Sequence, residues 1–217
     1  MKLWSKNNTN TTQAVEQFTV GKDKVFDTLL APYDVLGSIA HVKMLASIGL
    51  LTNQEMLALV NELQAIYQLV IQPGFTIPEG VEDIHSFVEL MLTQKLGDMG
   101  KKIHSARSRN DQVLVDIKLY LRAEIQTIAE STHHLFQLLQ QKSEEYKDCI
   151  LPGYTHLQLA MPSSFGLWFG AYAESLVDDL IMLESAYSIV NKNPLGSAAG
   201  YGSSFKKKKK MTTELLG

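Results

Sequence analysis

Residues 104–112 read H-S-A-R-S-R-N-D-Q and stand directly before a long run with the apolar spacing of a helix. Two arginines, two serines, an asparagine and an aspartate make this stretch too polar for a core segment. An arginine can hold a carboxylate through a bidentate fork, and serine and asparagine add short hydrogen-bond donors beside it. The stretch therefore predicts either a turn that binds a small polyanion or a solvated turn in which a side chain between Ser108 and Asp111 caps the following helix.

The run after this turn predicts one very long helix. From Asp111 to about Tyr146 there is no glycine or proline, and apolar residues recur with a helical period. A helix of roughly 35 residues is about three times the usual length in globular proteins. Because one small core cannot cover the whole apolar face of such a helix, we expect it to pack in a bundle or between subunits.

The chain before the turn predicts shorter helices. Apolar spacing indicates a helix over residues 35–51, and the capping box T-N-Q-E at 52–55 starts a second one. A third helix is expected to begin near Asp83, after the string E-G-V-E-D-I-H at 79–85. His41, on the first helix, is interpreted as a surface or hydrogen-bonded structural histidine. No stretch shows the alternation of a strand, so the predicted fold class is all-α.

A second polar break follows the long helix. Residues 151–158 read L-P-G-Y-T-H-L-Q, and a further helix is expected over about 163–190. Three polar side chains would then lie at a helix entrance, where free backbone amides favour an anion: Thr155, His156 and Gln158. A neutral histidine there could act as an acid or a base, or it could simply tie the loop to its neighbours.

The remaining polar segments give weaker signals. Helix capping explains the carboxylates near Asp83, and His85 beside them could either reach a ligand or be structural. The Gly/Ser-rich loop at 193–205 lacks the strand and the lysine of a phosphate-binding loop. The six histidines are scattered, so no metal site is predicted.

Composition excludes several classes of partner. The chain has 217 residues, 45% of them hydrophobic, and a net charge of −3, which gives no reason to expect nucleic acid or an anionic membrane as partner. No apolar run approaches the roughly 20 residues of a membrane span, and the first residues lack the apolar core of a signal peptide. A single cysteine, Cys149, fits a reducing compartment. We therefore expect a cytoplasmic protein.

Several separate motifs, in this order, carry a resemblance to a known family. They are P-Y-D-V-L-G-S-I-A-H-V-K-M-L at 32–45, E-D-I-H at 82–85, H-S-A-R-S-R-N-D-Q at 104–112, G-Y-T-H-L-Q-L-A-M-P at 153–162, and N-P-L-G-S-A-A-G-Y-G-S-S-F at 193–205. Together they resemble the argininosuccinate lyases of the fumarase/aspartase superfamily. The resemblance covers nearly the whole chain, and the form R-S-R-N-D-Q favours this lyase over other members of the superfamily.

The resemblance implies an architecture. Residues 1–104 would form a small N-terminal helical domain, and residues 105–217 would begin a central bundle of long helices. The protein would be a homotetramer in which each active site takes segments from three subunits.

The resemblance also implies a reaction. Argininosuccinate would be split reversibly into fumarate and arginine, as a step of arginine biosynthesis, without metal or organic cofactor. A base would remove a proton next to a carboxylate, fixed donors would stabilise the resulting aci-carboxylate, and an acid would protonate the departing guanidinium nitrogen.

Residue roles follow from the matching motifs. His156 matches the histidine assigned to acid–base work, and Asn110 and Thr155 match residues that bind substrate. Supporting contacts to the substrate are expected from five further residues: Ser108, Arg109, Gln158, Asp83 and His85.

The chain departs from the family pattern in three places. Phe18 is followed by T-V-G where members often carry a substrate-binding serine, so Gly21 could contribute only its backbone. Five lysines at 206–210 replace a string that usually contains proline and arginine; they are interpreted as a solvated charge run or as an alteration of the sequence. The third family signature, which supplies the serine base, is absent. Because members are about twice this length, the chain resembles an N-terminal portion and is expected to be inactive alone.

Other functions stay open at this point. An adenylosuccinate lyase or a fumarase would share the fold and much of the chemistry. A non-catalytic structural protein of the crystallin kind, or a helical interaction module, would share the fold alone.

Overall fold

The computed structural model describes residue 18 and residues 23–217, so the expectation for Gly21 lies outside the described residues. The chain divides into two compact units. The first comprises the residues up to Tyr120 together with Asn193–Gly217, and the second comprises Leu121–Lys192. Both units are built mainly from helices, which confirms the predicted fold class.

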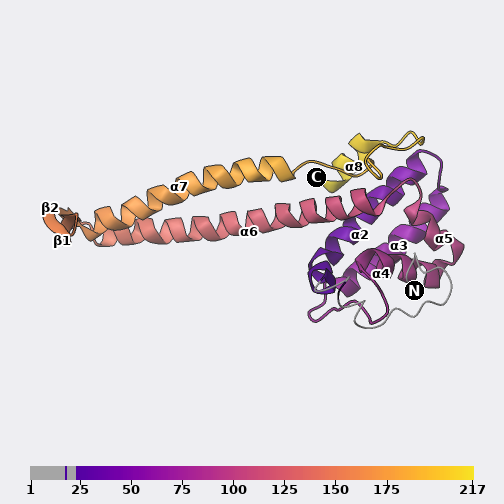
Figure 1. Ribbon diagram of the computed structural model, residues 1–217, viewed down its shortest axis with the longest axis horizontal. Coiled ribbons are helices and arrows are strands. Elements are labelled where there is room, and N and C mark those ends of the chain that lie inside the picture. The colour runs from indigo at the N-terminus through magenta and orange to yellow at the C-terminus, as the bar shows by residue number, and fades with distance from the viewer. Residues whose placement is uncertain (1–17, 19–22) are drawn as a thin grey trace. The chain divides into compact units, whose positions relative to one another are not determined.

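The first unit is a cluster of packed helices. Helices α2 (Asp23–Ser47), α3 (Asn53–Val70) and α4 (Ile84–Leu96) pack against one another (Figure 1). The short α5 (Asp98–Lys101) and a 3₁₀ turn, η1 (Lys102–His104), lead from α4 towards the polar turn.

The predicted capping box starts α3. The Thr52 hydroxyl accepts from the Glu55 amide, and the Glu55 carboxylate accepts from the Thr52 amide, so two otherwise free donors are satisfied. The two consecutive helices predicted from the apolar spacing and the capping box are present, with the first helix extended to Asp23.

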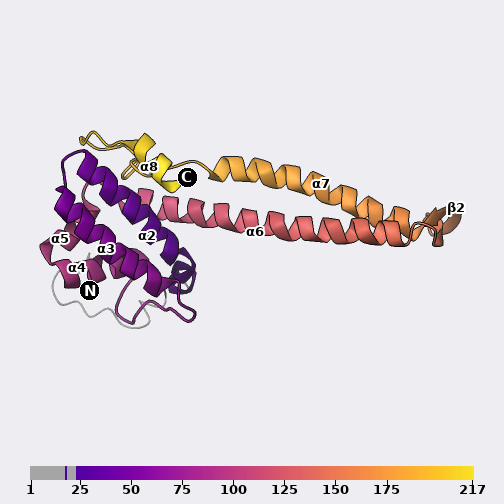
Figure 2. The ribbon, with the colours of Figure 1, turned by 180° about the vertical axis from the view of Figure 1, so that it is seen from behind.

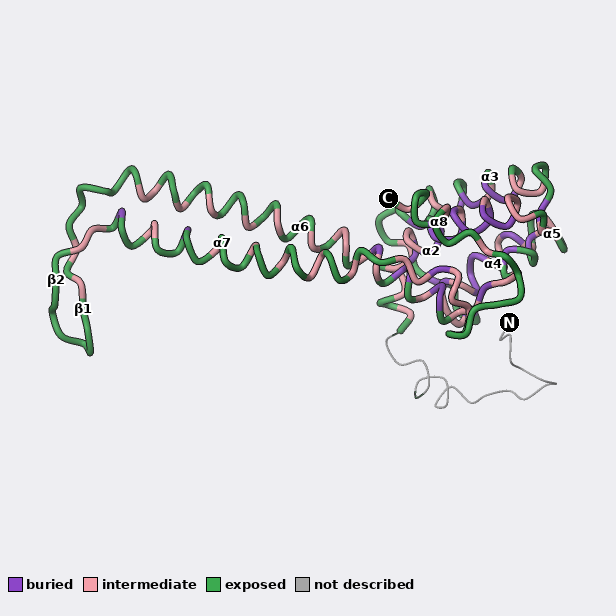
Figure 3. Tube along the Cα trace, turned by 90° about the horizontal axis from the view of Figure 1, so that it is seen from above, coloured by how far each residue is buried: buried purple, intermediate pink, exposed green. Residues whose placement is uncertain are grey.

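The core lies inside the first unit. Buried apolar side chains come from α2, α3, α4 and η1, and the buried part of the chain is concentrated there in Figure 3. The members with the largest fully buried side chains are Met44, Leu45, Leu59, Leu63, Ile66, Ile84, Leu92 and Ile103. Helix α8 (Lys209–Leu216) packs on α2. Within the lysine run at 206–210, Lys207 Nζ donates to the Ala106 carbonyl at 3.0 Å, so this lysine is bound rather than simply solvated.

The long helix is present as predicted. Helix α6 runs from Arg109 to Glu145, and its first turns are buried through Val115 and Leu119. Further along, the predicted apolar face is uncovered, since Ile128 and Leu138 are 51% and 45% exposed.

The second unit is an antiparallel helical hairpin. The part of α6 from Leu121 onward lies beside α7 (Phe165–Val190) in both Figure 1 and Figure 2. The Ser143 hydroxyl donates to the Gly166 carbonyl at 2.7 Å near one end, and Gln126 donates to the Tyr187 hydroxyl at 3.4 Å towards the other. Gly166 allows the close approach, because a Cβ there would lie 2.6 Å from the Cα of Lys147. None of the described helices is long and apolar enough to cross a membrane.

A small sheet joins the two helices of this unit, and the sequence did not predict it. Strands β1 (Ile150–Thr155) and β2 (Gln158–Ser164) pair antiparallel, and Thr155 is the partner of Gln158. Helix α7 starts only at Phe165, with Ser164 as its cap. The expectation that Thr155, His156 and Gln158 lie at a helix entrance is therefore wrong: they surround the turn of a β-hairpin. Its strands are mostly solvent-exposed, so they lack the apolar alternation that reveals a half-buried strand.

Candidate active site

A groove of about 460 Å³ in the first unit collects four of the predicted site residues. Asp83 and His85 reach it from the start of α4, and Arg109 and Asn110 reach it from the first turn of α6. Helix α2 forms the remaining wall, to which Asp27 contributes a carboxylate. Two motifs that lie far apart in the sequence are thus brought together around one opening.

Asp83 and Arg109 connect the two helix starts that line this groove. One Asp83 carboxylate oxygen caps α4 by accepting from the Ser86 amide at 2.7 Å. The other accepts from Arg109 Nη1 at 2.5 Å, while Nη2 of the same guanidinium donates to the Ser86 hydroxyl at 2.8 Å. Arg109 is therefore already engaged by the protein, and its role here is to hold the two walls together as well as to line the groove.

Ser108 lies just before α6 and caps the start of this helix. Its amide donates to Asp111 Oδ1 at 2.9 Å, and its hydroxyl accepts from the Asn110 amide at 3.3 Å. This reciprocal arrangement is a helix cap, so the capping interpretation of the polar turn is realised. Ser108 is not among the residues that line the groove.

Asp111 also fixes the Gly/Ser-rich loop. Its second carboxylate oxygen accepts from the amides of Gly196 and Ala198 at 3.0 and 2.7 Å. Because Asp111 is only 1% exposed, these bonds are shielded from solvent and tie the loop to the start of α6.

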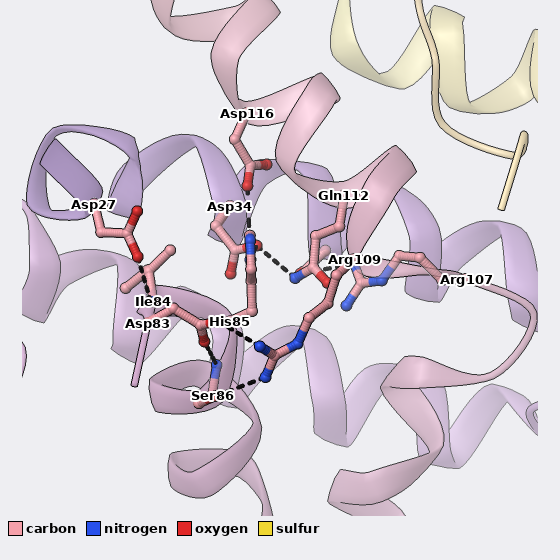
Figure 4. A network of polar contacts seen from close by, with 11 residues as sticks. Asp27, Asp34, Asp83, Ile84, His85, Ser86, Arg107, Arg109, Gln112 and Asp116 are labelled. Carbon is pink, nitrogen blue, oxygen red and sulfur yellow. Dashed lines mark hydrogen bonds and ion pairs between the residues drawn. The ribbon is translucent and has the colours of Figure 1, made fainter. Parts of the chain in front are cut away.

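His85, which lines the groove, is held from behind by two aspartates (Figure 4). Its Nδ1 lies 2.9 Å from Asp34 Oδ1 and 3.8 Å from Asp116 Oδ2, and both aspartates are fully buried. Burial opposes the charged imidazolium, but the charge and the hydrogen bond of Asp34 outweigh it and raise the pKa of His85. Gln112 adds a second hydrogen bond to Asp34 Oδ1, at 2.6 Å.

Hydrogen bonds between the polar turn and α2 stabilise the turn. Arg107 is buried and donates to the Ser38 hydroxyl at 3.0 Å, so it serves the interior and not the groove. His41 Nε2 donates to the Ser105 carbonyl at 2.9 Å, since a carbonyl can only accept. Burial, together with the nearby charge of Arg107, lowers the pKa of His41 to about 3. The interpretation of His41 as a hydrogen-bonded structural histidine is thereby confirmed.

Thr155, His156 and Gln158 belong to the second unit, at the turn of the β1–β2 hairpin. All three are exposed. His156 and Leu157 form the two-residue turn with positive φ angles of 49° and 63°, the left-handed region that asparagine and glycine normally occupy in such hairpins. A non-glycine residue in this conformation carries a cost that often accompanies a functional role.

Sequence reasoning missed Asp34, Asp116 and Asp27 as parts of the site. A usable signal exists for Asp116, because it follows Gln112 by one helical turn and lies beside the buried Val115. An ionisable residue on the buried face of a helix needs a partner, so its position was informative. Among the described residues, Asp34, His85 and Asp116 also bring three ligand-type atoms within 4.8 Å of one another. Asp34 and His85 are joined by a hydrogen bond of 2.9 Å, and the charge of the buried Arg107 acts on both aspartates.

Comparison with known proteins places the chain in a family of lyases. The model of the family described as "Lyase" matches residues 5–217, so the chain belongs to that family. Among curated relatives, it is 62% identical over 216 residues to an argininosuccinate lyase of Parabacteroides distasonis, and 40% identical to one of Thermotoga neapolitana. Both alignments cover 100% of this chain but 48% and 54% of the relative. The chain thus spans about half the length of the curated relatives it matches.

Solved structures confirm the fold. An EDDS lyase in complex with formate superposes with a TM-score of 0.78 at 24% identity, over 95% of this chain and 40% of that one. A class II fumarase from Schistosoma mansoni gives 0.74 at 18% identity, over 99% and 49%. At these identities the likeness establishes the helical fold and not the substrate.

Proposed function

We propose that this chain supplies part of an argininosuccinate lyase, which splits argininosuccinate reversibly into fumarate and arginine. The observation that carries the proposal is its 62% identity, over essentially the whole chain, to a protein of that name. The groove supports it, because Asn110 and His85 offer hydrogen-bond donors to a substrate with three carboxylates.

Each predicted residue has a role in the proposed β-elimination. His156 exchanges a proton with the substrate, and Asn110 and Thr155 bind it through short donors. Five further residues assist, either by binding the substrate or by shaping the site: Ser108, Arg109, Gln158, Asp83 and His85. In this structure Arg109 and Asp83 hold each other, so we assign them to shaping the groove, and Ser108 to orienting Asn110 through the helix cap. Nothing in this scheme requires a metal or an organic cofactor.

The assembly we propose is a homotetramer with active sites shared between subunits. Apolar side chains of α6 and α7 in the second unit remain uncovered in the single chain: Leu121, Ile128, Leu135, Leu138, Trp168, Tyr172, Ile181 and Ile189 are each more than a third exposed. Uncovered apolar area of this extent on two neighbouring helices favours burial against further copies. The predicted domain division after residue 104 is kept as part of this proposal, as are a cytoplasmic location and a role in arginine biosynthesis.

A chimera tests the activity. The present chain would be joined to the second half of the Parabacteroides distasonis relative, which carries the segments that have no counterpart here. Fumarate release from argininosuccinate, followed by ultraviolet absorbance, is the expected result, while the 217-residue chain alone is expected to be inactive. Turnover of adenylosuccinate or fumarate instead of argininosuccinate would replace the proposal with another lyase of the superfamily. A folded chimera inactive on all three would favour a structural role.

A further inference from the structure

His85 stands between two buried aspartates at the edge of the groove. Its side chain is 10% exposed and lines the opening, while its Nδ1 points inward to Asp34 and Asp116 (Figure 4). Because a carboxylate can only accept, Nδ1 must carry the hydrogen of the 2.9 Å bond to Asp34.

The arrangement of Asp34 and Asp116 indicates that one of their two carboxyl groups is protonated. Asp34 Oδ2 and both oxygens of Asp116 are buried and accept no hydrogen bond from any described residue. An oxygen of each carboxyl group lies within 4.8 Å of the other, and a side-chain hydrogen bond with Asp34 is one cause of the raised pKa of Asp116. Two charged carboxylates would repel at this distance, whereas one protonated carboxyl group would donate to the other and satisfy the buried oxygens.

The surrounding charges decide which carboxyl group holds the proton. Asp34 faces His85, Gln112 and Arg107, and their charges and hydrogen bonds outweigh burial and lower its pKa. Asp116 has none of these hydrogen bonds, so burial first, and then the charge of Asp34, raise its pKa well above the usual value. Asp116 is therefore the acid and Asp34 the carboxylate.

The charged groups on the other elements packed against His85 do not reverse this assignment of the charges. Asp83, on the same turn as His85, adds a charge that favours the imidazolium but is itself paired with Arg109. Asp27, on α2, lines the same groove, and burial raises its pKa. Arg107, from the polar turn, disfavours the imidazolium, but the nearer charge of Asp34 outweighs it.

We propose that Asp34 and Asp116 are positioning residues that share one proton and thereby hold His85 as an imidazolium at the groove wall, where it binds a carboxylate of the substrate. The carboxylate part of this inference rests on the proposed function; the state of the three side chains does not. With both ring nitrogens protonated, His85 donates and cannot act as the base, so the proton exchange of the reaction falls to other groups.

A titration of the 217-residue chain tests the inference without substrate. The ring carbon–proton NMR signals of the six histidines would be followed with pH, and His85 assigned from a His85→Gln variant. His85 is expected to titrate above the usual 6.5, while His41, also buried but hydrogen-bonded to a carbonyl, stays neutral down to about pH 4. A His85 midpoint at or below 6.5 in the unmodified chain would overturn the proposal, and this result needs no variant to fold.

Two isosteric variants separate the roles of the aspartates. Asp34→Asn removes the negative charge, so the His85 midpoint should fall relative to the unmodified chain. Asp116→Asn keeps a neutral group that can still donate to Asp34, so the midpoint should stay near that of the unmodified chain. Equal effects of the two variants, or no effect of Asp34→Asn in a folded chain, would contradict the shared proton.

The Asp34→Asn substitution also tests whether the network of Asp34, His85 and Asp116 contributes to substrate binding. In the chimera, Asp34→Asn should raise the KM for argininosuccinate about tenfold or more, the usual range for a lost charge-assisted hydrogen bond, with a smaller change in kcat. A raised His85 midpoint without any change in KM would retain the network but overturn its role towards the substrate. An inactive parent chimera would instead count against the proposed function and leave the titration result standing.

Discussion

The carboxylate of Asp83 accepts a hydrogen bond from the guanidinium of Arg109, and this pair joins the first turn of α4 to the first turn of α6. Both helix starts line the groove, so the pair sets the spacing between His85 on one wall and Asn110 on the other. The polar motif that looks like a carboxylate receptor is thus held in place by a carboxylate of the protein itself.

A double-mutant cycle measures the energy of this pair. Asp83→Asn and Arg109→Gln, made singly and together, should show a coupling of about 1 kcal/mol in urea unfolding, because the pair is partly buried and the substituted asparagine can still cap α4. The exposed pair Lys101–Asp98 on α5 is the matched control and should show no measurable coupling. Equal coupling at the two sites would contradict a structural role for Arg109.

Asp111→Asn should loosen the Gly/Ser-rich loop. The substitution leaves one acceptor where the carboxylate serves three amides, and each unsatisfied buried amide costs about 1–3 kcal/mol. Hydrogen exchange at Gly196 and Ala198 should accelerate. The Leu195 amide, which donates to Asn193 and not to Asp111, is the internal control. Unchanged exchange at the two loop amides would show that other contacts hold the loop.

Buried His41 should make the protein less stable in acid. Its folded-state pKa of about 3 lies below the usual 6.5, so between these values the unfolded chain binds a proton that the folded chain refuses. The free energy of unfolding should therefore fall by up to about 1.4 kcal/mol for each pH unit between pH 6 and pH 4 from this residue. His41→Gln keeps a donor for Ser105 and should reduce that slope, whereas the exposed His134→Gln should not. Identical slopes in all three proteins would refute the assignment.

The hairpin should be stabilised by glycine in its turn and weakened by glycine in its strands. Leu157→Gly places the residue that favours a positive φ at 63° and should stabilise the hairpin by about 1 kcal/mol. Leu159→Gly, a substitution of another exposed leucine in β2, should weaken the strand. Amide exchange in β1 and β2 reports both effects. Slower exchange in the Leu159→Gly protein, or faster exchange in the Leu157→Gly protein, would contradict this view of the turn.

The local features of the fold could be predicted because short-range chemistry determines them. Thr52 and Glu55 encode a cap within four residues, and the absence of glycine and proline after Asp111 encodes the long helix. The hairpin was missed because its turn residues, His156 and Leu157, are not those that normally mark one, and its strands cover no core.

The candidate site could be predicted in its motifs but not in its interior. Asp83, His85, Arg109 and Asn110 come from two separate motifs and line one groove. The roles of Asp34 and Asp116 depend on contacts between α2, α4 and α6 that no spacing within one segment reveals. Sequence alone therefore names some of the residues that line the groove, whereas the structure adds the two aspartates that face its histidine.

The most direct test of the proposed function is His156→Asn in the chimera. Asparagine tolerates a positive φ, so the turn should survive and only the imidazole is lost. Fumarate release from argininosuccinate should fall by about 10²–10⁴-fold, the usual contribution of acid–base catalysis, with the fold and the KM little changed. Turnover equal to that of the parent chimera would contradict the assignment of His156 and, with it, the account of how this chain takes part in the reaction.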